Sequence, residues 1–330
     1  MSLIKRVKSP SLLAVLLAAM TTAPALAVEW IMASGYPDSN FMTKNIRLFI
    51  EDVEKASDGA LTITLHPNDT LIKHDNIRRA VQRGQVQIGE IRLGVHSNED
   101  PMYGLAALPF IASNYEEAWR LKEAQKPYFD QLMGEIGIDV LAYQPWPGQG
   151  FYTRFPVTST EDFAGKKLRI YSRPTQEMGE ALGFEATILP FAEIPQAFAT
   201  GLIEALFTSP QTGIDIQAWD NTDYFTLVGA IYSKNAIIVN QQAFESLDPE
   251  LQTVLLEAGE RATQRGWEMS EATLKAQMET LADNGMTVTE GSAEIIEAMK
   301  AIGQTMMERW RESASPEAVA VLDNYLQSIQ

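Results

Sequence analysis

Hydrophobic positions in the first half of the chain alternate between helical and strand-like spacing. Asn40 can cap a helix that runs to Glu54, because the apolar residues between them recur at helical spacing. Further helices are predicted at 75–83, where Gly84 ends the pattern, and at 115–133. Short apolar or alternating runs predict strands around these helices, at 30–33, 61–65, 86–91 and 138–143.

The second half of the chain repeats this alternation. Strands are predicted at 151–154, 167–171, 187–189, 205–208 and 236–240, and helices at 174–183 and 192–200. Residues 248–250 (Asp-Pro-Glu) start a helix that can run to Asp283, which is long for a globular domain, and residues 315–317 (Ser-Pro-Glu) start the last one. The pattern predicts an α/β protein with mainly parallel sheets, whose ligands bind beyond the carboxyl ends of the strands.

Residues 1–27 are predicted to be a secretory signal. Lys5, Arg6 and Lys8 form a basic start, residues 12–20 are apolar, and residues 25–27 (Ala-Leu-Ala) form a small-residue cleavage site. The apolar run is too short for a stable membrane span, so the mature chain is predicted to begin at Val28 and to be exported and soluble. The sequence contains 0 Cys, which leaves no disulfide framework and no thiolate metal site.

The mature chain is strongly acidic. Without the three basic residues of the leader, 23 Lys and Arg remain against 43 Asp and Glu, a formal charge of −20. Nucleic acid is not expected as a partner, because phosphate contacts need a basic field. Any site for an anion must therefore be local. About 300 residues are enough for one large domain or two smaller ones.

The chain lacks the residue patterns that an enzyme needs. Its histidines, His66, His74 and His96, match no zinc-binding spacing. It has no glycine-rich phosphate loop and no G-x-S-x-G nucleophile motif. The sequence therefore predicts that the protein is not an enzyme and holds no metal or cofactor.

Residues 165–171 (Gly-Lys-Lys-Leu-Arg-Ile-Tyr) form a basic, strand-like segment in this acidic protein. Arg169 lies between Leu168 and Ile170, so its side chain points to the opposite face of the strand. A guanidinium that is held on a strand suits bidentate binding of a carboxylate. The alternative is a structural ion pair with an acidic residue, and geometry alone favours neither.

Several segments of the chain occur in the order that is typical of one family. They include residues 65–67 (Leu-His-Pro), 80–86 (Ala-Val-Gln-Arg-Gly-Gln-Val), 108–110 (Leu-Pro-Phe), 165–169, 190–193 (Pro-Phe-Ala-Glu), 197–201, 204–205, 239–240 and 247–250. On these motifs the chain resembles, over essentially its whole mature length, the extracytoplasmic solute receptors of tripartite ATP-independent periplasmic (TRAP) transporters, of the dicarboxylate-binding (DctP) type.

The resemblance implies a two-lobe periplasmic binding protein fold, in which a long helix spans both lobes and a cleft closes over one small solute. Lobe I would comprise residues 28–146 and 236–273, and lobe II residues 147–235 and 274–330 with the C-terminal helices. The receptor would lie in the periplasm and deliver its solute to the membrane permease subunits of a TRAP transporter. In this family one arginine binds the ligand carboxylate, and the match places it at Arg169.

The chain departs from the family near the expected ligand. A second arginine of many relatives falls near Gln149, with Arg154 a few residues further on, and the sequence does not decide which of the two takes its place. Residues 207–209, which include Thr208, stand where many relatives have an acid and an asparagine. Arg92 stands where some sugar-acid receptors have a glutamate. These departures weigh against a dicarboxylate or a sialic-acid-like ligand.

Further residues are candidates for the cleft. Phe191 matches a family residue that packs against the ligand. Trp146 could stack on a ligand, cage an ammonium group or pack at the hinge. Glu90 and Arg92 share one side of a strand, and they could pair with each other or bind an ammonium and a carboxylate, respectively. Two more candidates lie next to strand ends: Tyr36 and Asn235.

The favoured interpretation is a periplasmic receptor for a small carboxylate-bearing solute that is anchored by Arg169. One alternative keeps the receptor but changes the solute to a small amine or zwitterion, such as an amino alcohol or an amino acid; the missing second arginine, the aromatic residues and Glu90 motivate it. A remote alternative is an exported enzyme on the same fold. The identity of the ligand, the oligomeric state and the coupling ion of the transporter stay open.

Overall fold

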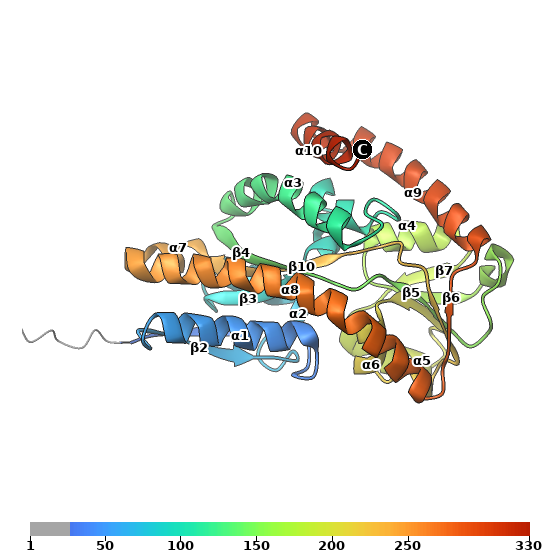
Figure 1. Cartoon of the computed structure of the whole chain (residues 1–330), viewed down its shortest axis with the longest axis horizontal. Coiled ribbons are helices and arrows are strands. Elements are labelled where there is room, and N and C mark those ends of the chain that lie inside the picture. Colours follow the sequence, from blue (N-terminus) through green and yellow to red (C-terminus); the bar gives the residue numbers. More distant parts are fainter. Residues whose placement is uncertain (1–26) are drawn as a thin grey trace, which may run out of the picture.

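The computed structural model describes residues 27–330, so the predicted leader lies, except for its last residue, outside the described residues. Two β-sheets, each covered by helices, form two lobes, called lobe I and lobe II below (Figure 1). The chain passes from lobe I to lobe II after Pro145 and returns before Lys234. This is the two-lobe α/β architecture that the resemblance implies.

Lobe I is built on a five-stranded sheet in the order β2–β1–β3–β10–β4. Its strands are β1 (Val28–Ala33), β2 (Leu61–His66), β3 (Ile88–Arg92), β4 (Ile138–Pro145) and β10 (Lys234–Asn240). Helical segments of this lobe are α1 (Phe41–Ala56), α2 (His74–Gln82), α3 (Tyr115–Gly134), α7 (Gln241–Glu245), and the 3₁₀ turns η1 (Leu93–His96) and η2 (Pro101–Ala107). Asn40 caps α1 as predicted, because its side chain accepts the backbone N–H of Met42 at 2.8 Å.

Lobe II is built on a six-stranded sheet in the order β11–β9–β5–β8–β6–β7. Its strands are β5 (Gly150–Thr153), β6 (Lys167–Ile170), β7 (Glu185–Ile188), β8 (Ala205–Thr208), β9 (Tyr224–Leu227) and β11 (Thr287–Glu290). Its helical segments include η3 (Thr160–Phe163), α4 (Arg173–Ala181), η4 (Phe191–Glu193), α5 (Ile194–Ala199), α6 (Pro210–Asp215) and η5 (Ala218–Asp220). The single helix predicted at 192–200 is wrong in detail: η4 and α5 divide it, and Pro195 lies in the first turn of α5.

The sheets are mixed rather than mainly parallel, which corrects the prediction from the alternating pattern. β5 is antiparallel to β8 and β9, and β10 is antiparallel to β3 and β4. Each of these two strands follows a crossing between the lobes, so it enters its sheet from the cleft and runs opposite to neighbours that end there. Hydrophobic periodicity does not encode strand direction, so the pattern could not reveal this.

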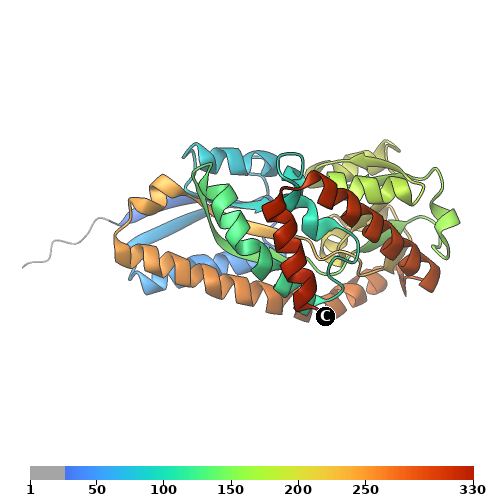
Figure 2. The ribbon, with the colours of Figure 1, turned by 90° about the horizontal axis from the view of Figure 1, so that it is seen from above.

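The helix predicted from residue 249 to Asp283 is confirmed as α8 (Pro249–Asp283), and it packs against α1 and β4 of lobe I and against α6 and β11 of lobe II. The C-terminal helices are α9 (Ala293–Ser313) and α10 (Pro316–Ser328). α10 packs on α3 of lobe I (Figure 2). The division into lobes that the resemblance implies, with residues 274–330 in lobe II, stays a prediction. The sequence patterns did not predict α9, β9 or β11.

Close contact between α8 and the sheet of lobe I requires Gly259. A Cβ atom at this position would lie 2.2 Å from the carbonyl oxygen of Leu141, whereas a Cβ at Gly134, at the end of α3, would meet no atom within 4 Å. We expect Gly259→Ala to lower the free energy of unfolding by about 1–3 kcal/mol through overpacking. Gly134→Ala should raise it by up to about 1 kcal/mol through helix propensity. Urea unfolding of both variants tests this; equal effects would contradict it.

Candidate ligand-binding site

A cavity lies where the strand ends of both lobes meet at the cleft. It holds ≈ 50 Å³ of space for the centres of water molecules, which is room for about four waters. Eight of the nine predicted site residues line it: Tyr36, Arg92, Trp146, Gln149, Arg169, Phe191, Thr208 and Asn235. The ninth, Glu90, is not among the lining residues. That the lining residues touch a ligand stays a prediction.

Arg169 lies on β6 with only 2 % of its surface exposed. Leu168 and Ile170 pack into the core on one face of the strand, and the guanidinium reaches the cavity from the other. Its Nε and Nη2 atoms donate to the carbonyl oxygen of Leu189 at 3.1 and 2.9 Å. It makes no ion pair within residues 27–330. Burial and the nearby charge of Arg92 lower the pKa of Arg169 to about 9.

The carbonyl of Leu189 therefore orients one edge of the guanidinium and leaves its charge uncompensated. Leu189 follows β7, and its own N–H bonds to the carbonyl of Ile170, which fixes the acceptor to the same sheet. A neutral acceptor holds a cation in place without neutralising it. The alternative of a structural ion pair with an acidic residue is therefore wrong: within residues 27–330 the partner of Arg169 is a backbone carbonyl. That Arg169 binds a ligand carboxylate stays a prediction.

Lys234 is a second buried cation in the cavity wall, and sequence reasoning missed it. It is the first residue of β10 and is 5 % exposed. Its Nζ donates to Oε1 of Gln125 on α3, and it makes no ion pair within the described part of the chain. Burial and the neighbouring Lys122 lower the pKa of Lys234 to about 7. The predicted strand starts at 236, so the pattern did not place Lys234 on a strand at the cleft.

Gln149, rather than Arg154, lies in the cavity wall at the crossing between the lobes. Its Nε2 donates to Oγ of Ser233 at 3.0 Å, and its Oε1 accepts the hydroxyl proton of Tyr171 at 2.7 Å. Arg154 is exposed and donates to the carbonyl of Asn221 outside the cavity. Of these two residues, the neutral Gln149 therefore lines the cavity; that it takes the place of the second family arginine stays a prediction.

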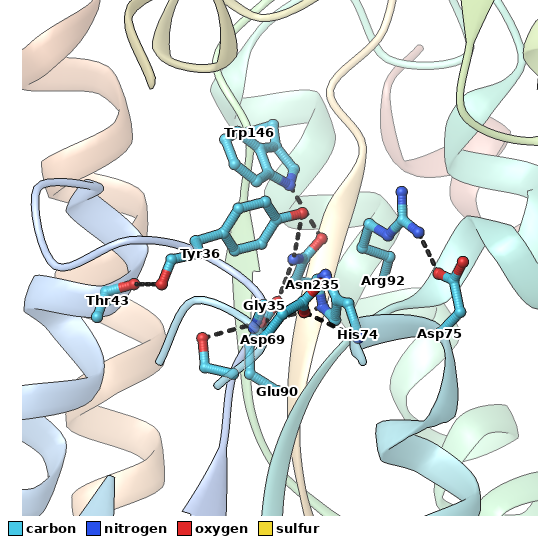
Figure 3. Close-up of polar contacts among 11 residues, drawn as sticks. Gly35, Tyr36, Thr43, Asp69, His74, Asp75, Glu90, Arg92, Trp146 and Asn235 are labelled. Carbon is cyan, nitrogen blue, oxygen red and sulfur yellow. Dashed lines mark hydrogen bonds and ion pairs between the residues drawn. The ribbon is translucent and has the colours of Figure 1, made fainter. Parts of the chain in front are cut away.

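Three aromatic rings form an apolar wall of the cavity. Tyr36 packs edge-on against Trp146 and Phe191, with ring centroids 5.0 and 5.6 Å apart. The indole Nε1 of Trp146 donates to Oδ1 of Asn235 at 2.9 Å, which fixes the ring (Figure 3). Thr208 adds a hydroxyl group from the end of β8. The wall offers flat apolar area beside a few polar groups, as small-molecule sites commonly do.

Glu90 supports the cavity from outside its lining. It is fully buried, and its carboxylate contacts His74 at 3.1 Å and accepts hydrogen bonds from Ser34, Gly35 and Asn235 (Figure 3). Burial alone would raise the pKa of Glu90, but His74 and the hydrogen bonds from Asn235 and Gly35 hold that pKa below its ordinary value. Glu90 thus pairs with His74 and not with Arg92, which corrects the first alternative given for it.

Arg92 lies on the same side of β3 as Glu90, as predicted, but its partner is Asp75 (Figure 3). Its Nε is buried without a hydrogen-bond partner. Together with Arg169 and Lys234 it makes the cavity wall cationic, and no acidic residue of the described chain lines the cavity. Such a wall favours a carboxylate and disfavours an ammonium group.

Two α/β lobes with a cationic cavity between them define a solute receptor. The chain belongs to the DctP family, bacterial extracellular solute-binding protein family 7, whose model matches residues 32–313. It is thus an extracytoplasmic solute receptor of the TRAP type, as the sequence motifs indicated.

Relatives of known structure share the whole fold. DctP7 of Bordetella pertussis, a receptor that binds pyroglutamic acid, is 38% identical with a TM-score of 0.89, covering 91% of this chain and 99% of that chain. A marine metagenome TRAP protein specific for pyroglutamate is 32% identical with a TM-score of 0.88, covering 91% and 99%. The C4-dicarboxylate-binding DctP of Rhodobacter capsulatus is 26% identical over 275 residues, 81% of each chain.

Among residues 27–330, no helix combines the length and the apolar character that a membrane span requires. The same residues contain no group of three or more His, Cys, Asp or Glu placed to hold a metal ion.

Lys234 provides a test of the buried charge. In the unfolded chain its pKa is 10.5, against about 7 in the folded state, so the unfolded state binds more protons between these values and the folded state gains stability as pH rises. The loss of folding stability caused by the buried charge of Lys234 is complete below pH 7 and vanishes near pH 10.5. We expect Lys234→Met to raise the free energy of unfolding by about 1–4 kcal/mol at pH 6 and far less at pH 10.

Urea unfolding at both pH values measures this effect. Lys275→Met is the matched control, since the Lys275 side chain is 89% exposed on α8, and it should change stability by less than about 0.5 kcal/mol at either pH. A loss of stability in Lys234→Met at pH 6, or an equal gain at both pH values, would contradict a buried charge.

Proposed function

We propose that this chain is the periplasmic receptor of a TRAP transporter for a small monocarboxylate, with pyroglutamic acid as the leading candidate. The observation that carries the proposal is the guanidinium of Arg169, which has a neutral protein partner in a cavity lined by cations and, among residues 27–330, by no acid. Three relatives of known structure above 30% identity bind pyroglutamate, which supports the choice of ligand.

The ligand carboxylate would take the open edge of Arg169, where two N–H groups can face two oxygens. Lys234 would add a second charge-assisted contact. Gln149 has a neutral amide where many relatives have a second arginine, so it suits a polar uncharged group, such as a lactam, better than a second carboxylate. The rings of Tyr36 and Phe191 would pack on the apolar part of the solute.

Transport requires that binding be coupled to closure of the lobes. The cavity walls come from both lobes, so a solute contacts all of them only when the cleft is closed. Contacts that exist only in the closed state shift the equilibrium toward it, and the membrane permease subunits would then receive the closed, loaded receptor. The receptor releases its solute unchanged in this scheme, without a catalytic role.

Replacement of Arg169 tests the anchor. Arg169→Gln removes the charge but keeps a hydrogen-bonding group, and we expect it to weaken L-pyroglutamate binding by about 2–5 kcal/mol. Arg154→Gln removes one positive charge outside the cavity and should leave the affinity within about twofold. Isothermal titration calorimetry of both variants decides between them; wild-type affinity in Arg169→Gln would remove the anchor from the proposal.

A set of close analogues tests the class of solute. L-pyroglutamate should raise the melting temperature, because a ligand that binds only the folded state stabilises it. L-pyroglutamamide, in which a neutral amide replaces the carboxylate, should leave the melting temperature unchanged. L-proline keeps the ring and the carboxylate but carries an ammonium group that the cationic wall disfavours, and ethanolamine carries only the amine. A larger shift with proline or ethanolamine than with pyroglutamate would favour the amine or zwitterion alternative.

A further inference from the structure

A second hollow adjoins the binding cavity and shares Arg92, Val95 and Tyr171 with it. It is much wider, with ≈ 510 Å³ of space for water centres. Its charged walls define what we call the arginine groove: Asp75, Arg78, Arg79, Arg92, Glu99 and Arg173.

The arginine groove runs along the seam between the lobes. Lobe I supplies Arg78 and Arg79 from α2 and Arg92 from the end of β3, and lobe II supplies Arg173 from the start of α4. Leu189, whose carbonyl holds Arg169, also lines the groove. The groove therefore adjoins the buried anchor through Leu189 and the residues that line both spaces.

The groove is positively charged in a protein that is otherwise strongly negative. Arg78 pairs with Glu99 at 2.5 Å and Arg92 pairs with Asp75, which leaves Arg79 without an ion pair among the described residues and Arg173 with only a 3.4 Å contact to Glu177. Burial and the charge of Arg78 lower the pKa of His96, another wall residue, to about 4, so it adds no charge at neutral pH.

We propose that the arginine groove is the access route for organic anions, and that its excess positive charge steers them from solution to the cavity. The inference rests on the proposed function of the cavity. A mature chain with a formal charge of −20 repels an anion at long range, so capture needs a local region of opposite sign at the seam through which the solute enters. Arg92, which lines both spaces, would be the first cavity residue that the anion meets.

Association kinetics distinguish steering from binding. Arg79→Gln with Arg173→Gln removes two exposed charges from the groove and leaves the cavity walls intact. We expect the association rate of L-pyroglutamate to fall about three- to tenfold at about 20 mM NaCl, while the dissociation rate stays within about twofold. At about 500 mM NaCl the difference should disappear because salt screens exposed charges. Stopped-flow tryptophan fluorescence measures both rates.

The matched control is Arg83→Gln with Arg309→Gln, which changes the net charge equally at two exposed arginines outside the groove. Its association rate should stay within about twofold of the wild type. An equal loss in both double variants would show a general charge effect, and a change confined to dissociation would show direct binding; either result overturns the steering role.

If the wild type does not bind pyroglutamate, that result contradicts the proposed ligand but not the groove. A second measurement tests the groove without this ligand. Nitrogen-15 NMR of the arginine Nε–H groups is recorded while acetate is added. The signals of Arg79 and Arg173 should shift, and those of Arg83 and Arg309 should not. Equal shifts in all four, or none in the groove, would overturn the groove as an anion route.

Discussion

The site depends on one hydrogen-bonded pair: the guanidinium of Arg169 and the carbonyl oxygen of Leu189. A carboxylate in that place would have neutralised the charge and closed the site, and water alone would have left the side chain free to rotate. A backbone carbonyl on the adjoining strand does neither. It fixes the direction of the cation and leaves its charge for a ligand, which is the preorganisation that a selective anion site requires.

For such a site to work, a buried acid must find its partners within the protein, whereas the buried cations must keep their charge for the ligand. Glu90, a fully buried carboxylate near the cavity, contacts His74 and is surrounded by hydrogen-bond donors, so its charge is satisfied inside lobe I. Asn235 carries that network to Trp146 in the aromatic wall. The acid thus shapes the cavity without presenting its charge to it, whereas Arg169 and Lys234 have only neutral partners. Under the proposed function, the difference in partners, not the number of charges, would make the cavity favour anions.

The sequence predicted those parts of the site that depend on local pattern. The alternation of Leu168, Arg169 and Ile170 places an arginine opposite a core face, and the structure has that arrangement. Lys234 could not be found in this way, because its partner Gln125 lies 109 positions earlier, on a helix of the same lobe. The partner of Glu90 likewise comes from α2, and the directions of β5 and β10 follow from the path between the lobes. Local spacing carries no information on such contacts.

The same buried cations can explain why closure should depend on the solute. In an open cleft, water would hydrate the free edge of Arg169 and the ammonium group of Lys234. Closing without an anion removes that water from two charges whose protein partners are neutral, which is costly in a medium of low dielectric constant. One of the interlobe hydrogen bonds, from Asn40 to Asp215 at 2.6 Å, is worth only about 1–3 kcal/mol and offsets a fraction of that cost. A carboxylate in the cavity removes the penalty itself, so the anion stabilises the closed state mainly by compensating charge that the protein leaves unpaired.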